Sequence, residues 1–168
     1  MKEVKSGIAP SVFKNLSGIE YFEFEEDFVE QNIRCIPMIV RFKMDAAGIK
    51  LKLAEWAKFD KQERIGLAVK NCSTHLEIEE YKNYLLETIT RRTGHSGTIM
   101  SVNENPEWAK ATTVPEKVLE KMKDFGASIS IEKWSSLTNL QRFALLKLVR
   151  PGHENKNFPI AMKEFKLM

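Results

Sequence analysis

The chain has 168 residues, of which 43% are hydrophobic, so it can bury one good core but is short for two independent domains. Its net charge is only +3, and acidic and basic residues are mixed along the chain, which argues against a nucleic-acid partner. Two cysteines are too few for a disulfide framework, and the longest apolar run, residues 36–40, is much shorter than the roughly 20 residues of a membrane span. Because no leader sequence is recognisable, we expect a cytoplasmic protein with no membrane partner.

The first 17 residues differ in character from the rest of the chain. Residues 1–17 mix lysine, serine, glycine and proline without a period, which predicts a disordered or extended arm. We expect residues 18–168 to form a single domain. It divides into a first half (18–92), a polar connection (93–112) and a second half (113–168), because one pattern of residues occurs in both halves.

That pattern recurs at a constant offset of 78 positions. The matched residues are Gly48 and Gly126, Leu51 and Ile129, Leu53 and Ile131, Trp56 and Trp134, Phe59 and Leu137, Arg64 and Arg142, and Leu67 and Leu145. Such an internal repeat predicts two similar halves related by a pseudo-twofold duplication. The repeated glycines, tryptophans and arginines are most simply explained as parts of the scaffold.

The first half contains three predicted helices. Pro37 suits the first turn of a helix that ends at Gly48, where glycine can adopt the left-handed conformation. Residues 49–53 alternate apolar and polar side chains, which is typical of an extended segment. Asp60 and Thr74 each precede a glutamate by three residues, and this capping-box pattern predicts that a helix begins after each of them.

The second half repeats this order. Gly126 again ends a predicted helix, and residues 127–131 again alternate. Thr138 and the glutamine three residues later predict the start of a helix whose residues 140–148 are apolar on most faces, as in a buried central helix. A last short helix is predicted from Phe158, with a proline in its first turn.

These elements define an all-α fold. We predict a single compact domain built from two similar helical halves. One short two-stranded pairing between residues 49–53 and 127–131 is a further candidate feature, since a duplication would place these equivalent segments about a common axis.

The main candidate site is the polar segment between the apolar helix and the last one. Its candidate residues for binding a partner or a ligand are Arg150, His153, Glu154, Asn155, Lys156 and Asn157. A histidine beside a glutamate is able to transfer protons. In the alternative interpretation, His153 and Asn155 hydrogen-bond exposed helix ends and Asn157 caps the last helix. We assign no catalytic residue.

A metal site is the next possibility. Cys35, Cys72, His75 and His153 together would supply two sulfurs and two nitrogens, a set that zinc accepts. The second half does not repeat them, because threonine and Arg150 occupy the positions equivalent to the two cysteines. No phosphate-binding loop, nucleophile elbow or zinc-protease motif occurs. We therefore expect neither a metal nor another cofactor.

Several motifs together resemble one known family. They are Phe22–Glu25, Arg34–Met38, Gly48–Leu53 with Trp56, Leu137–Thr138, Leu140–Leu145 and Arg150–Phe158. They resemble the nitrate reductase-associated protein family, and the resemblance covers about residues 20–166. The long string Arg150–Phe158 makes it specific.

The resemblance implies an accessory protein for a cytoplasmic assimilatory nitrate reductase, an enzyme that carries a molybdenum cofactor and iron–sulfur centres. Such a protein would help the reductase or its assembly machinery through protein–protein contact, without reducing nitrate itself. The absence of a catalytic motif also favours a protein that is not an enzyme. The alternative is a small enzyme, or a protein that binds a small ligand or a metal, that uses the loop Arg150–Phe158.

Overall fold

The structure is a computed structural model that describes residues 16, 18–25 and 35–168; for His153 and Glu154 it describes the backbone only. These residues are mostly helical, so the predicted all-α fold is confirmed. The predicted arm, residues 1–17, lies almost entirely outside the described residues.

The chain divides into two compact units. The first comprises the described residues up to Asn103 apart from Phe22–Phe24, and the second comprises Phe22–Phe24 together with Glu104–Met168. The boundary lies in the polar segment 93–112. The expected single domain stays a prediction, and each unit is described by itself below.

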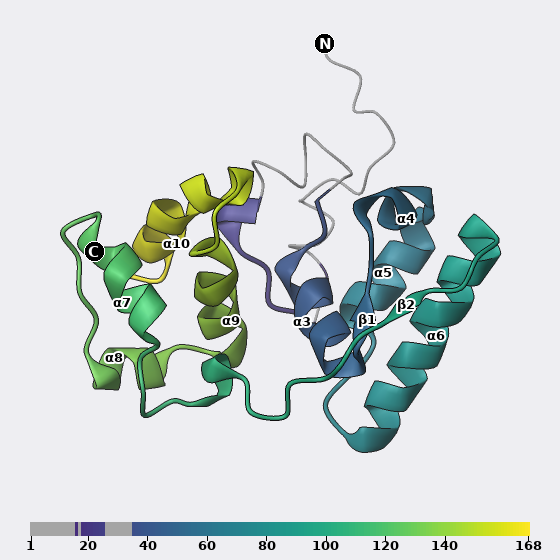
Figure 1. Ribbon diagram of the computed structural model, residues 1–168, viewed down its shortest axis with the longest axis horizontal. Helices are drawn as coiled ribbons and strands as arrows, with labels where there is room; N and C mark the ends of the chain where they lie inside the picture. The colour runs from purple at the N-terminus through teal and green to yellow at the C-terminus, as the bar shows by residue number, and fades with distance from the viewer. Residues whose placement is uncertain (1–15, 17, 26–34) are drawn as a thin grey trace, which may run out of the picture. The chain divides into compact units, whose positions relative to one another are not determined.

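The first unit is built around one long helix. Its elements in chain order are α3 (Met38–Ala47), β1 (Ile49–Lys50), α4 (Leu53–Lys58), α5 (Lys61–Val69), α6 (His75–Thr93) and β2 (Thr98–Ile99), which can be followed in Figure 1. Helices α3, α4 and α5 all pack against α6. Tyr81 and Leu85 of α6 are buried, and the hydroxyl of Tyr81 donates to the carbonyl of Leu67 at 2.7 Å, which joins α6 to α5.

The helix ends of the first unit follow the local sequence signals. The side chains of Asp60 and Thr74 accept from the N–H groups of Glu63 and Glu77, so both predicted capping boxes are confirmed. Gly48 ends α3 in the left-handed conformation with a φ of 70°, as its position predicts.

The second unit is built around a buried helix. Its elements are η2 (Glu107–Ala109), α7 (Glu116–Lys123), α8 (Ile131–Ser136), α9 (Asn139–Leu148), η3 (His153–Asn157) and α10 (Phe158–Glu164). The predicted central helix is confirmed, because six of the ten residues of α9 are buried. Thr138 caps it as predicted, by accepting from the N–H of Gln141 at 3.1 Å.

A short aromatic segment completes the second unit. Phe22 precedes the 3-10 helix η1 (Glu23–Glu25), Phe24 lies within it, and the two rings stack with centroids 5.2 Å apart. Phe22 also meets the ring of Phe165 edge-on at 5.1 Å. The carboxylate of Glu164 accepts from the backbone N–H of Glu23 at 2.7 Å, so one charged group and one aromatic cluster hold this segment on the end of α10.

Equivalent helices of the two units begin 78 positions apart in the sequence. The pairs are α3 and α7, which begin at Met38 and Glu116, α4 and α8, which begin at Leu53 and Ile131, and α5 and α9, which begin at Lys61 and Asn139. The repeated sequence pattern is therefore accompanied by the same order of helices.

The predicted pairing between residues 49–53 and 127–131 is wrong. Strand β1 pairs with β2 in antiparallel register, with Ile49 opposite Ile99, and residues 127–130 form neither helix nor strand. The physical reason is the path of the chain after α6. This helix packs against α3 and ends at Gly94, so the chain that leaves it lies beside β1, whereas α9 is followed by η3 and no strand.

Candidate functional site

The candidate loop joins α9 to α10 as a single turn of 3-10 helix, η3. The side-chain amide of Asn155 donates to the carbonyl of Leu148 at 2.9 Å and to that of Arg150 at 3.3 Å. Leu148 is the last residue of α9, where helix geometry leaves the carbonyl without an intrahelical partner, and Arg150 lies two residues beyond the helix. The structural role predicted for Asn155 is therefore confirmed, and its amide fixes the loop on α9.

The two basic residues of the loop face solvent. The side chains of Arg150 and Lys156 are exposed, and neither forms an ion pair with any carboxylate that the structure describes. Lys147, one turn earlier, lies over the ring of Phe143 at 5.0 Å. The side chains of His153 and Glu154 lie outside the described part of the chain, and with them the predicted proton-transfer pair. The described side chains thus present positive charge to solvent.

Asn157 differs from the other loop residues because it is completely buried, with 0% of its surface exposed. Neither its amide nitrogen nor its amide oxygen has a hydrogen-bond partner within the described structure. The predicted capping role is wrong. Asn157 occupies the position before α10, but its backbone is helical (φ −82°, ψ −8°), and its side chain makes no bond to the first turn.

The described candidates for zinc ligands do not come together, and the side chain of His153 lies outside the described part of the chain. No group of three or more histidine, cysteine, aspartate or glutamate side chains in the described structure could hold a metal ion, and Cys35, Cys72 and His75 form none. Burial raises the pKa of Cys72 to about 11, and its sulfur lies 3.7 Å from the carbonyl of Lys43. Cys72 is therefore protonated at neutral pH, which does not suit a nucleophile.

The repeated arginines brace the tryptophan segments. Arg64 donates to the carbonyls of Trp56 and Ala57 at 3.1 to 3.3 Å, and its guanidinium lies 5.6 Å from the centroid of the Trp56 ring. Arg142 donates to the carbonyls of Trp134 and Leu137. The scaffold interpretation of the repeated arginines is therefore confirmed.

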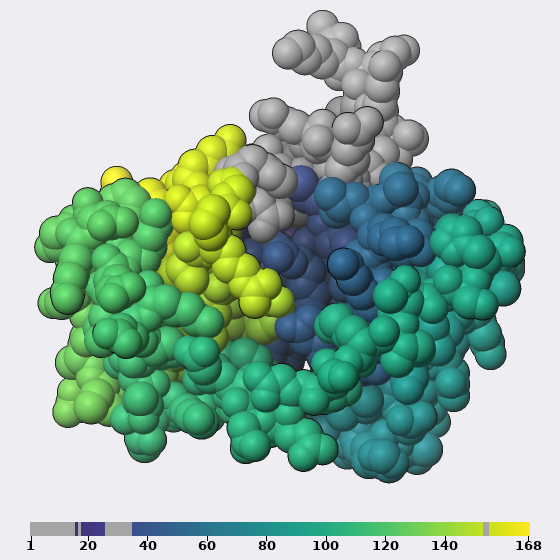
Figure 2. Space-filling view, in the orientation of Figure 1, coloured from purple at the N-terminus to yellow at the C-terminus, as the bar shows by residue number. Residues whose placement is uncertain are grey.

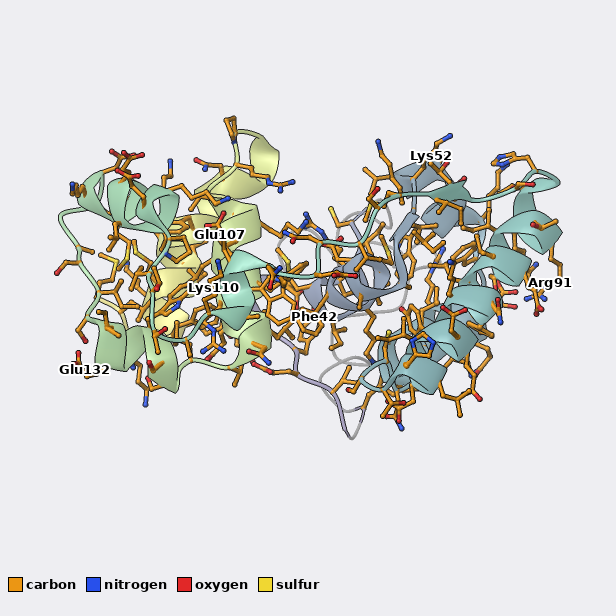
Figure 3. The ribbon with its side chains drawn as sticks, turned by 60° about the horizontal axis from the view of Figure 1, so that its bottom comes forward. Phe42, Lys52, Arg91, Glu107, Lys110 and Glu132 are labelled. Atoms are coloured by element: carbon orange, nitrogen blue, oxygen red, sulfur yellow. The ribbon has the colours of Figure 1, made fainter. Side chains whose placement is uncertain are left out.

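Arg142 in the second unit makes hydrogen bonds to more residues than Arg64 in the first. Arg142 also donates to the carbonyl of Trp108 in η2, at 2.7 Å, and to the side chain of Asn139. The indole of Trp134 donates to the carbonyl of Lys110 at 2.9 Å, and Figure 3 shows Lys110 and Glu107 on the η2 segment. The segment 107–110 is thus held against α8 and α9 by hydrogen bonds to the backbone carbonyls of Trp108 and Lys110.

An ion-pair network that sequence reasoning did not find joins α6 to α5. Glu63 accepts from Arg91 at 2.8 Å and from Arg92 at 2.9 Å, and Arg92 also reaches Asp60 at 2.6 Å. Burial alone would raise the pKa of Glu63, but the hydrogen bonds from Arg91, the backbone at Asp60 and Arg92 outweigh it, so this pKa lies below its usual value. The available sequence signal was the pair of arginines in the last turn of α6.

A buried carboxylate in α4 was also missed. Glu55 is 3% exposed, and one of its oxygens accepts from the N–H of Lys52 at 2.8 Å. The other oxygen has no hydrogen-bond partner within the described structure, and it lies 4.0 Å from the Nδ1 atom of His95. Lys52 makes no side-chain cap hydrogen bond at the start of α4, so the sequence carried no capping residue that would have identified this helix.

Among the described residues, the longest helix, α6, is too polar to span a bilayer, and no other helix is long enough.

Comparison with known proteins gives one match. The model of a family described as "conserved nitrate reductase-associated protein" matches residues 21–165, which is most of the chain and includes the candidate loop. The resemblance inferred from the sequence motifs is therefore confirmed. Neither a curated protein nor a solved structure matches the chain.

Proposed function

Because the chain belongs to the conserved nitrate reductase-associated protein family, we propose that it is an accessory protein that assists nitrate reductase through direct protein contact. Its partner is the reductase itself or the machinery that assembles it. We place this contact in the cytoplasm, with an assimilatory enzyme that carries a molybdenum cofactor. The protein itself does not reduce nitrate.

The observation that carries the proposal is the state of the loop between α9 and α10. Arg150 and Lys156 are exposed without a described ion-pair partner, while Asn155 holds the loop backbone on the end of α9. A partner that places carboxylates opposite the two cations gains charge-assisted hydrogen bonds and breaks none of the ion pairs that the structure describes. The fixed backbone also reduces the entropy lost when the loop is bound.

Co-purification tests this contact. Tagged wild-type protein should recover nitrate reductase, or a protein needed for its assembly, from the organism that encodes the chain. The double variant Arg150→Glu/Lys156→Glu should recover at least tenfold less, because like charges at an interface oppose binding. The matched control is Lys58→Glu/Lys61→Glu, which reverses two exposed lysines of the first unit and should recover as much as wild type.

Deletion of the gene supplies the functional test. Nitrate reductase activity and cofactor loading should fall in the deletion strain, and the wild-type chain but not the loop variant should restore them. Unchanged activity and loading after deletion would contradict the accessory role. Equal recovery by the loop variant and the control would remove the loop as the contact while leaving the accessory role in place.

A further inference from the structure

The two-stranded sheet of the first unit has one buried strand and one exposed strand. Ile49 in β1 has 0% of its surface exposed, whereas its cross-strand partner Ile99 in β2 is 57% exposed. Thr98 beside it is exposed as well. In the space-filling view, the chain near residue 100 lies at the surface beside the blue residues of β1 and α4 (Figure 2). The sheet therefore ends at β2, on the solvent side.

The hydrogen-bond pattern leaves the backbone of Ile99 unused. Lys50 lies opposite Thr98, and the N–H of Met100 donates to the carbonyl of Gly48 at 2.8 Å. In an antiparallel ladder, hydrogen-bonded and non-hydrogen-bonded pairs alternate, so the N–H and C=O of Ile99 point away from β1. No backbone partner for these two groups occurs within the described structure. They form an open edge of the kind that accepts a further strand.

Close packing holds this edge in an extended conformation. A side chain at Gly97 would come within 2.8 Å of Leu86 in α6, and one at Gly48 would come within 2.8 Å of the carbonyl of Met100 and 2.9 Å of Val102. Glycine at both positions lets the β2 segment lie directly against α6 and α3. An edge that is already extended and anchored loses little conformational entropy when a strand is added.

The side chains on the two faces of the sheet define what could bind there. Ile49 and Ile99 lie side by side on one face of the sheet, with Ile49 buried and Ile99 exposed at the edge. An apolar side chain of an added strand would pack next to Ile99 on this face. The opposite face carries Lys50 beside Thr98, and Lys52 follows two residues later; in Figure 3 the side chain of Lys52 points away from the helices. Neither lysine pairs with a carboxylate among the described residues.

We propose that β2 is a docking edge for an extended partner segment in which apolar and acidic residues alternate. Neighbouring strands lie about 4.8 Å apart, and β2 would lie between β1 and the added strand. An acidic residue opposite Thr98 would therefore lie about two strand spacings from Lys50, with only the small side chain of Thr98 between them. Extended glutamate and lysine side chains bridge that distance. A second copy of this chain paired through β2 would instead place lysines on both sides of that face, with no carboxylate between them.

This docking edge is independent of the contact made by the loop between α9 and α10. It lies in the first unit, whereas the loop lies in the second, and its backbone edge and side chains share no residue with the loop. The two contacts can therefore be tested and refuted separately.

A capped octapeptide of alternating valine and glutamate is a direct probe for the edge. With the full chain, it should bind and slow hydrogen exchange at the N–H of Ile99, because that group becomes a donor to the added strand. An octapeptide of alternating valine and lysine should bind at least tenfold more weakly. The double variant Lys50→Glu/Lys52→Glu should reverse this preference, while Lys58→Glu/Lys61→Glu should leave it unchanged.

A pair of isoleucine variants tests the apolar face. Ile99→Ala should weaken binding of the valine–glutamate peptide about tenfold, since the added strand loses an apolar neighbour. Ile131→Ala removes an equally exposed isoleucine of the second unit, where Ile131 is 53% exposed, and should have no effect.

Four results would overturn the proposal: no binding of either peptide, equal binding of both, protection of amides away from β2, or protection of Ile99 that rises with protein concentration in the absence of peptide. The last result would identify a second copy of the chain as the occupant. Because only this chain and synthetic peptides are present, none of these results bears on the contact with nitrate reductase.

Discussion

Replacing Asn157 by leucine should make the protein more stable, although the residue is completely buried. Within the described structure, the buried amide has an unpaired donor and an unpaired acceptor, each of which costs about 1–3 kcal/mol of desolvation without a compensating hydrogen bond. Leucine has the same branching as asparagine but is bulkier, and overpacking costs about 1–3 kcal/mol. We expect Asn157→Leu to raise the free energy of unfolding by about 1 kcal/mol, which corresponds to about 2–4 °C in Tm.

Urea unfolding followed by tryptophan fluorescence measures this change. A Trp56→Phe background leaves Trp108 and Trp134, both in the second unit, as the reporters, and an unchanged m-value would show that the same surface unfolds. A loss of about 1 kcal/mol or more in Asn157→Leu, matched by a loss in Asn157→Ala, would refute the reasoning, because it would mean that the amide makes favourable hydrogen bonds.

If Asn157 is retained for function, the leucine variant should be stable yet recover less nitrate reductase in co-purification. Such a trade-off is expected where a polar group is kept at a cost to the fold. Recovery equal to that of wild type would show that the buried amide serves neither the contact nor the fold.

Two further predictions concern the scaffold. Arg142→Ala should lower the free energy of unfolding by about 3–5 kcal/mol and Arg64→Ala by about 2–3 kcal/mol. Arg142 donates to three carbonyls and Arg64 to two, and every one of these carbonyls would lose its charged donor. A larger loss for Arg64→Ala than for Arg142→Ala in urea unfolding would contradict this prediction. Because the folded pKa of Glu63 is lowered, its stabilising effect is complete above the unfolded pKa of about 4.3 and is lost as pH falls through the folded pKa. Stability measured from pH 6 to 3 should therefore fall less steeply in Glu63→Gln than in wild type, while the exposed control Glu116→Gln should match wild type.

The helix starts could be predicted because their signals are local. Asp60, Thr74 and Thr138 each satisfy an N–H group only three residues away, and the partner residue is visible in the sequence. The glycine after α3 is equally local, since only the conformation of Gly48 itself is involved. No knowledge of the tertiary structure was needed for any of these.

The short helices α4 and α8 could not be predicted from periodicity. Each has six residues, less than two turns, so the apolar pattern cannot show a helical period before the helix ends. The alternating residues 49–53 and 127–131 instead suggested extended segments. In the second copy Ile131 already begins α8, and the apolar side chain at that position is exposed.

Two features could not be predicted from the sequence. The pairing of β1 with β2 depends on contacts between residues distant in sequence, and the burial of the Asn157 amide depends on the conformation of the turn before α10. Ile99 lies opposite Ile49 because α6 brings the chain back past α3, which no short pattern encodes. Asn157 stands immediately before a helix with proline in its first turn, where asparagine is a common cap. The 3-10 turn η3 makes the backbone at Asn157 helical and turns its amide into the interior.

The difference between the two repeated copies supports a function at the loop. After α5, the first copy continues into the 19-residue helix α6, which fastens α5 through Arg91 and Arg92. After α9, the second copy continues into a five-residue 3-10 helix whose described side-chain hydrogen bonds to α9 come from the single amide of Asn155. Two such hydrogen bonds contribute about 1–3 kcal/mol and fix the loop backbone while its basic side chains remain exposed, so the second copy presents a pre-ordered polar loop where the first copy continues into a packed helix.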